Sequence, residues 1–182
     1  MSKPSQVIVV LEDDHHKRLV YRYLINRGLR PHAMTILPSP AGCGSAWVRK
    51  TFLDEVTNYR RRRAKAATAL IVVIDADTHT VQDRLVQLDQ ALKDGRKEPV
   101  DVEREQIARL VPKRNVETWI LCLNMRVVDE KADYKRPAED WDNLIPQAAE
   151  TLSEWTHQEA EPPNHCVDSL RKGIKELNRL RL

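Results

Sequence analysis

The stretch ALIVVIDAD, residues 69–77, places six apolar residues directly before the tripeptide Asp-Ala-Asp. An unbroken apolar run of this kind is typical of a strand that is buried on both faces of a parallel sheet. We therefore expect a central strand over residues 69–74. Asp75 and Asp77 follow at the point where this strand ends.

Two more apolar runs lead into acidic residues. Residues 7–11 run directly into Glu12, and residues 107–111 lead through a short turn to Glu117. The apolar runs alternate with amphipathic helical patterns, and this alternation predicts βαβ units with a parallel sheet. The carboxyl ends of parallel strands share one edge of the sheet, so the acids that follow them are expected to converge there.

The whole pattern predicts an α/β fold with a mainly parallel central sheet of about four strands, helices on both faces and a helical C-terminal extension. We assign residues 1–128 to the α/β domain and residues 129–182 to a loop and helical extension of the same domain. Ser45 and Asn115 are expected to cap helices, and residues 129–143 are polar and loop-like. The expected strands are 7–11, 32–37, 69–74 and 107–111, and the expected helices are 13 or 14 to 26, 45 to about 63, 78 or 80 to 94, one from 115, 147–157 and 168–180.

The composition bounds the class of protein. The 182 residues, 41% of them hydrophobic, are enough for one sizeable core, and the formal net charge of +3 permits a nucleic-acid partner without requiring one. Three widely spaced cysteines without a CxxC pair favour neither a disulfide framework nor a zinc site. No long apolar stretch or signal-peptide core is found, so we expect a soluble, cytoplasmic protein and no membrane partner.

The acids at the predicted edge are suited to a hard divalent cation. Mg²⁺ prefers oxygen ligands and needs only one or two carboxylates beside a substrate phosphate. In an extended backbone, residues two apart point the same way, so Asp75 and Asp77 can face one cation, with Glu12 and Glu117 completing a site for Mg²⁺ or Mn²⁺. Crowded carboxylates repel one another, and a bound cation relieves that repulsion. A purely structural role remains open, because acids also cap helix N-termini and complement the helix dipole there.

These motifs resemble the Toprim domain shared by topoisomerases, primases and nucleases of the OLD (overcoming-lysogenization-defect) type. Toprim domains carry a glutamate after the first strand and Asp-x-Asp after the third, matched by Glu12 in VVLEDD (9–14) and by Asp75 and Asp77 in VVIDAD (72–77). Small OLD-like Toprim proteins add a later glutamate in a segment similar to PKRNVETW (112–119), which contains Glu117. The resemblance covers about residues 7–123. Many Toprim domains have glycine after the first glutamate, whereas this chain has Asp13.

The resemblance implies Mg²⁺- or Mn²⁺-dependent nucleic-acid cleavage, with Glu12 as general acid or base and with Asp75, Asp77 and Glu117 as metal ligands. By the same analogy, an ABC-type ATPase could gate the nuclease in defence against phage or plasmids. The departure at Asp13 keeps a second hypothesis open, namely a non-catalytic regulatory or assembly module of the same fold.

A third hypothesis comes from another class of protein. A response-regulator receiver domain has paired acids after its first strand and a phosphoacceptor aspartate after its third, which Asp13, Asp14 and Asp75 imitate. Receiver domains also require a lysine after the start of a fifth strand, and no such lysine can be placed in this sequence. The receiver would be a signalling switch and not a nuclease.

Basic residues and histidines complete the candidate site residues. Lys113 and Arg114 lie near Glu117 and could stabilise a scissile phosphate. The run Arg60, Arg61, Arg62 and Arg63 with Lys65 is either a patch that contacts nucleic-acid phosphates or a set of cations that opposes a helix dipole. A transition-metal site with His15, His16 or His79 is conceivable, but such histidines more often lie exposed in the first turn of a helix.

Overall fold

The computed structural model describes residues 3–63, 66–135, 139–157 and 160–182, and within them it contains one four-stranded sheet. All three strand pairings are parallel, and the strand order is β2-β1-β3-β4. The predicted α/β class and the parallel sheet of four strands are confirmed. The strands are β1 (Gln6–Leu11), β2 (Met34–Pro38), β3 (Thr68–Val73) and β4 (Ile107–Leu110).

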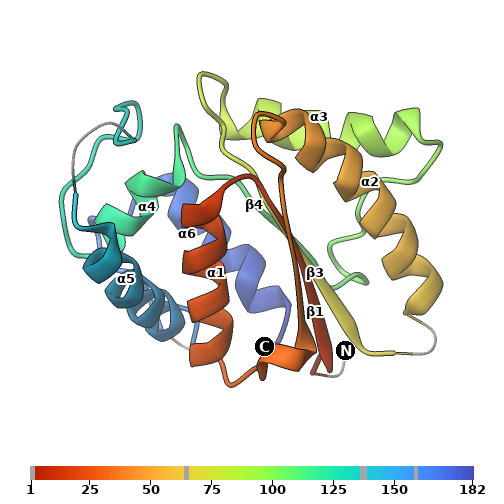
Figure 1. The fold of residues 1–182 in the computed structure, drawn as a ribbon, viewed down its shortest axis with the longest axis horizontal. Helices are drawn as coiled ribbons and strands as arrows, with labels where there is room; N and C mark the ends of the chain where they lie inside the picture. Colours follow the sequence, from red (N-terminus) through yellow and green to blue (C-terminus); the bar gives the residue numbers. More distant parts are fainter. Residues whose placement is uncertain (1–2, 64–65, 136–138, 158–159) are drawn as a thin grey trace.

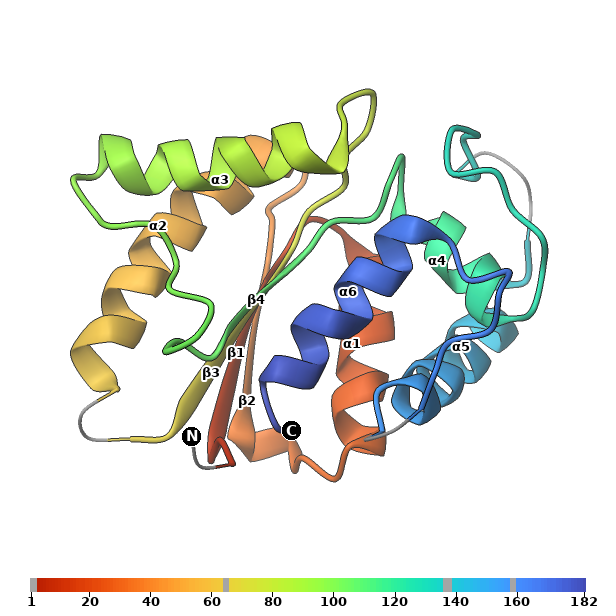
Figure 2. The same cartoon turned by 180° about the vertical axis from the view of Figure 1, so that it is seen from behind.

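The helices cover both faces of the sheet. Figure 1 shows α1, α4, α5 and α6 on one side and α2 with α3 on the other, and Figure 2 shows the same layers from behind. Each face has its own buried apolar cluster, because alternate residues of β1 and β3 point to opposite faces. The helices are α1 (Asp14–Asn26), α2 (Gly44–Arg62), α3 (Val81–Asp94), α4 (Val116–Leu123), α5 (Trp141–Trp155) and α6 (Asp168–Arg179).

The central position predicted for β3 is confirmed. Every residue of β3 is buried, and the strand pairs with β1 on one side and β4 on the other. The register aligns Leu11 with Val73, so the residues after β1 and β3 leave the sheet side by side. Glu12, the residue after Leu11, accepts a hydrogen bond from the Asp75 amide just beyond the paired residues.

Three boundary predictions are wrong. The strand expected from residue 32 begins at Met34, because Pro31–Ala33 form a short 3-10 helix. Ser45 does not cap α2, which begins one residue earlier at Gly44 with Cys43 at the N-cap and no side-chain cap. Gly42 and Gly44 have positive φ angles of 80° and 46°, so the loop turns into the helix through backbone conformations that favour glycine. The helix expected over 147–157 begins at Trp141, inside the segment expected to be a loop, because Asp140 caps it.

The helices beyond residue 128 share a core with the rest of the chain. Ile145 and Leu152 of α5 and Leu170 and Ile174 of α6 belong to the same buried cluster as Val9 of β1. None of the helices in the described part of the chain is long and apolar enough to cross a membrane.

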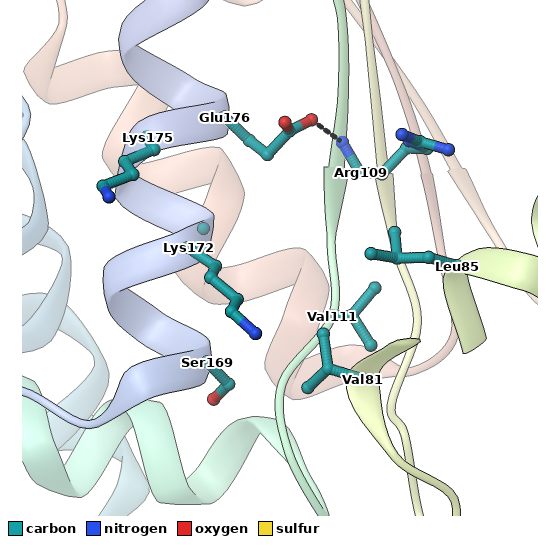
Figure 3. Close-up of a pocket in the computed structure, with 9 residues that line it drawn as sticks. Val81, Leu85, Arg109, Val111, Ser169, Lys172, Lys175 and Glu176 are labelled. Carbon is teal, nitrogen blue, oxygen red and sulfur yellow. Dashed lines mark hydrogen bonds between the residues drawn. The ribbon is translucent and has the colours of Figure 1, made fainter. Parts of the chain in front are cut away.

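Helix α6 covers the outer edge of the sheet. Edge strands expose backbone groups that can pair with other chains, and here α6 side chains bond to them. The Arg109 amide of β4 donates to Glu176 Oε2 at 3.0 Å (Figure 3), and Arg179 Nη2 donates to the Ile107 carbonyl at 2.7 Å. A cavity of about 220 Å³ remains beside this edge, between α3, β4 and α6. Its lining includes Val81, Leu85, Val111 and Lys172.

Replacing Glu176 with alanine should lower the free energy of unfolding by about 1–2 kcal/mol, because the partly buried Arg109 amide loses its acceptor. Urea denaturation followed by circular dichroism measures the change. Lys175→Ala removes an exposed side chain from the same helix and should leave stability nearly unchanged. Equal stability of the two variants would contradict the proposed role of Glu176 at the edge.

Candidate metal site at the carboxyl edge of the sheet

Asp75 is the centre of the acidic edge. Its side chain follows β3 and is 0% exposed. The Asp75 backbone amide donates to Glu12 Oε2 at 3.2 Å, which brings the acid after β1 against the acid after β3. The next residue, Ala76, donates its amide to the Pro112 carbonyl after β4. The segments after the three strands are therefore joined at one edge, as the sequence predicted.

His16 lies beside Asp75 and is fully buried, so the expectation that it is exposed is wrong. Asp13 is the N-cap of α1 and accepts from the His16 amide, which turns the third residue of the helix inward. His16 Nδ1 lies 2.8 Å from Asp13 Oδ1, and Nε2 lies 3.0 Å from Asp75 Oδ1. The imidazole thus bridges two carboxylates.

Both ring nitrogens of His16 face carboxylate oxygens, which favours the doubly protonated imidazolium. Burial alone would lower the pKa of His16, but Asp75 and Asp13 outweigh it and raise this pKa to about 10. Burial acts to raise the pKa of Asp13, yet its bonds to His16 hold that pKa well below the usual range. Ligand atoms of Asp13, His16 and Asp75 all lie within 4.8 Å of one another, a spacing that suits a metal ion, but the imidazolium form of His16 has no lone pair to offer one.

Lys135 is a second cation at the same carboxylate. Its Nζ lies 2.9 Å from Asp75 Oδ2 and 3.8 Å from Asp13 Oδ2. Partial burial opposes the charge of Lys135, but Asp75, Asp13 and Glu117 together raise the pKa of the ammonium. The residue comes from the polar segment before α5, and no local sequence pattern marks it as part of the site.

Glu117 approaches from the first turn of α4. Its side chain is 3% exposed, and its Oε1 lies 2.7 Å from His15 Nδ1. The hydrogen bond to Glu117 raises the pKa of His15. The other carboxylate oxygen, Oε2, is buried and has no hydrogen-bond partner among the described residues. An unpartnered buried carboxylate oxygen is a position that suits a cation.

Asp77 lies at the rim and does not extend the strand. Strand β3 ends at Val73, and Asp77 has a positive φ of 52°, so the argument from extended backbone does not apply to Asp75 and Asp77. Asp77 Oδ2 instead pairs with Arg84 Nη2 at 3.1 Å. Burial, followed by the charge of Asp75 and with a smaller contribution from Asp77, raises the pKa of Glu12. Glu12, Asp75 and Asp77 therefore affect one another electrostatically, but Glu12, Asp77 and Glu117 are not part of the described group of potential ligand atoms within 4.8 Å.

Arg84 is a buried cation that the sequence reasoning missed. It lies on the buried stripe of α3 with Leu88 and Leu92, at helical spacing. Burial lowers the pKa of Arg84, against the attraction of Asp77 and Glu12. A charged residue in the otherwise apolar stripe of a helix is a sequence signal for a buried ion that pairs with an acid.

Lys113 and Arg114 lie on the turn between β4 and α4. Lys113 Nζ donates to the His79 carbonyl, and the Arg114 carbonyl accepts from the Asp77 amide at 3.0 Å. Arg114 Nη2 lies 3.4 Å from Asp133. Both residues thus border the loop that carries Asp77, and their roles toward a phosphate remain predictions.

The arginine run lies away from the acids. Helix α2 ends at Arg62, just before β3 begins, so the run is near the amino edge of the sheet while the acids occupy the carboxyl edge (Figure 1). Arg60 bonds to both oxygens of the buried Glu105, at 2.7 and 2.9 Å. Arg61 and Arg62 are exposed. Lys65 lies outside the described residues.

No protein-family model and no curated protein matches this chain. Two solved structures are similar in fold. Both are C-terminal regions of OLD proteins. The one from Burkholderia pseudomallei is 11% identical, with a TM-score of 0.43, and the match covers 95% of this chain and 96% of that one. The one from Xanthomonas campestris pv. campestris is 15% identical, with a TM-score of 0.38, and covers 96% and 92%.

OLD proteins are also the group that the sequence motifs resemble.

In the metal-free protein, His16 should remain an imidazolium well above pH 7. The His16 pKa is raised from 6.5 to about 10, so its contribution to folding is full below pH 6.5 and is lost as the pH rises through about 10. Imidazole ¹⁵N shifts against pH measure the protonation, and thermal unfolding over the same range measures stability. A His16 that loses its proton near pH 6.5 would contradict this bridge between Asp13 and Asp75.

Arg60→Ala should destabilise the fold by about 2–3 kcal/mol, because it leaves the carboxylate of Glu105, 2% exposed, without its principal partner. Arg61→Ala removes the same charge from an exposed position and should change stability by less than about 0.5 kcal/mol. Chemical denaturation of the two variants tests the difference. If both behave alike, the pair between Arg60 and Glu105 has no structural role.

Proposed function

We propose that this chain is a divalent-metal-dependent phosphodiesterase that cleaves nucleic acid at the carboxyl edge of its sheet. The observations that carry the proposal are the fully buried Asp75, whose amide bonds to Glu12 Oε2, and the buried Glu117 Oε2, which has no hydrogen-bond partner among the described residues. A buried carboxylate oxygen without a hydrogen-bond partner is costly unless it serves a charged ligand or catalysis.

Mg²⁺ or Mn²⁺ would be held by oxygen atoms of Asp75, Glu12 and Glu117, with Asp13 beside them and Asp77 at the rim. The unpartnered Glu117 Oε2 and the all-carboxylate character of this set fit a hard cation. Such a cation supplies neutralisation of the phosphate charge and activation of water for attack on phosphorus.

Glu12 is the proposed general base. Burial and the charge of Asp75 raise its pKa, so its carboxylate has a greater proton affinity than an ordinary glutamate. A base of this kind can accept the proton of an attacking water and later return it to the leaving oxygen. The hydrogen bond from the Asp75 amide to Oε2 orients the Glu12 carboxylate.

Lys113 and Arg114 are proposed to face the scissile phosphate from the turn before α4. Lys113 is tied to the His79 carbonyl, close to the loop of Asp77, so its ammonium borders the acidic edge. Cations in this position can stabilise the charge that develops on the phosphate oxygens. The exposed Arg61 and Arg62 lie at the opposite edge and could contact a more distant part of the nucleic acid.

The partner and the biological role are proposed on analogy alone. An ABC-type ATPase that gates cleavage, in defence against phage or plasmids, follows from the resemblance of the motifs to OLD-like proteins. The non-catalytic module is the alternative in which the fold and metal site are kept without turnover.

One observation favours the receiver alternative. Lys135 contacts the carboxylate of Asp75, as the lysine of a receiver would contact its phosphoacceptor, although Lys135 follows no fifth strand in the described sheet. Incubation with acetyl phosphate and Mg²⁺ separates the two functions: a receiver gains one phosphoryl group on Asp75, seen by mass spectrometry, whereas the phosphodiesterase gains none.

The nuclease activity is tested on plasmid DNA, single-stranded DNA and RNA with Mg²⁺ or Mn²⁺. The wild type should cleave at least one substrate, and a chelator should abolish cleavage. Glu12→Gln and Glu117→Gln should each lower the rate about 100-fold or more, because each loses a carboxylate charge at the site.

Asp54→Asn is the matched control, because it makes a similar change at an exposed position on α2 and should keep full activity. Thermal unfolding of each variant verifies that it folds. Cleavage that persists equally in Glu12→Gln and Glu117→Gln would exclude the acidic edge as the catalytic site and indicate a contaminating nuclease.

A further inference from the structure

Lys135 places an ammonium where a bound cation would be expected. Its Nζ lies 2.9 Å from Asp75 Oδ2 and 3.8 Å from Asp13 Oδ2, and its charge also interacts with Glu117. We infer that Lys135 is a built-in counter-ion that holds the divalent-metal position in the metal-free chain and must leave when the metal binds. The inference rests on the proposed function, because it concerns the same carboxylates.

The surrounding residues position Lys135 at the acids. Asp133 Oδ1 accepts from the Lys135 amide at 3.0 Å and from Asn115 Nδ2 at 3.0 Å. Arg114 Nη2 approaches the other Asp133 oxygen at 3.4 Å. Asp133 therefore fastens the segment that carries Lys135 to the turn before α4. The approach of Lys135 to Asp75 is fixed by contacts outside the ion pair itself.

Lys135 is the exchangeable cation of the site, and His16 is the fixed one. The side chain of Lys135 is 39% exposed, so it can swing into water on its flexible stem without opening the core. The side chain of His16 is 0% exposed and is held at both ring nitrogens, so its departure would disrupt buried bonds. Binding of a divalent ion at Asp75 therefore displaces Lys135 first.

Displacement has a measurable consequence for affinity. A divalent ion that binds the Asp75 oxygen contacted by Lys135 would lie close to the ammonium, and like charges at such separations repel strongly. Metal binding must therefore break the pair between Lys135 and Asp75, and the observed affinity is weaker by the cost of breaking it. The chain is then folded and charge-balanced at low metal concentration, and half-saturation requires a higher metal concentration than it would without Lys135.

The test is Mn²⁺ binding by calorimetry to the wild type, Lys135→Met and Lys131→Met. Methionine keeps the apolar stem of Lys135 and removes its charge, so Lys135→Met should bind Mn²⁺ about tenfold or more tightly than the wild type. Lys131→Met removes the same charge from an exposed position in the same segment and should bind as the wild type does. An unchanged or weaker affinity of Lys135→Met would overturn the inference.

A second readout follows Lys135 directly. Amine labelling with an N-hydroxysuccinimide ester, followed by mass spectrometry, should show that Mn²⁺ increases labelling of Lys135 and leaves Lys131 unchanged. Labelling of Lys135 that Mn²⁺ leaves unchanged or reduces would also overturn the inference.

Glu117→Gln separates this inference from the proposed function. Metal binding that is weakened in Glu117→Gln but unaffected by Lys135→Met would leave the metal site in place and refute only the role of Lys135. A wild type and a Lys135→Met variant that both fold yet bind no Mn²⁺ would refute the proposed function and the inference with it.

Discussion

The fold at the acidic edge depends on how the buried charge of Asp75 is compensated. An isolated carboxylate in a protein interior is costly, and Asp75 is 0% exposed. His16 and Lys135 supply positive charge to its two oxygens. These partners link Asp75 to the start of α1 and to the segment before α5, so one side chain connects regions that are far apart in the sequence. Removal of Asp75 would therefore leave two cations without their principal partner.

The fold could be predicted from the sequence because its signals are local. The apolar run before Asp75 marks a strand buried on both faces, and the structure buries every residue of β3 between two neighbouring strands. The parallel arrangement then follows from alternation with helices, and the meeting of the segments after β1, β3 and β4 follows from the shared edge. None of these steps required knowledge of which side chains touch.

The pairings at the site could not be predicted, because they join distant segments. Lys135 reaches Asp75 from a polar segment that has no hydrophobic periodicity. His16 lies in the first turn of α1 and is turned inward by its hydrogen bond to Asp13, the N-cap of the same helix. Asp77 departs from the expected direction because β3 ends before it and its backbone adopts a positive φ. Arg84 was recognisable in principle as a charge on a buried helical stripe. In each case a side-chain contact, and not a backbone pattern, decides the outcome.

The source of positive charge changes the argument for a metal. Crowded carboxylates suggested that a bound cation was needed to relieve their repulsion, yet the chain itself supplies His16, Lys135 and Arg84. The negative charges at the acidic edge are consequently compensated without a metal, so the presence of the acids alone does not require a metal ion. The case for a metal rests instead on Glu117 Oε2, which is buried without a hydrogen-bond partner among the described residues, and on Lys135, the one of these three cations with a substantially exposed side chain. A divalent ion at Asp75 would replace the single positive charge of Lys135 with two. Binding would then be an exchange of one cation for another, and not the filling of an uncompensated acidic pocket.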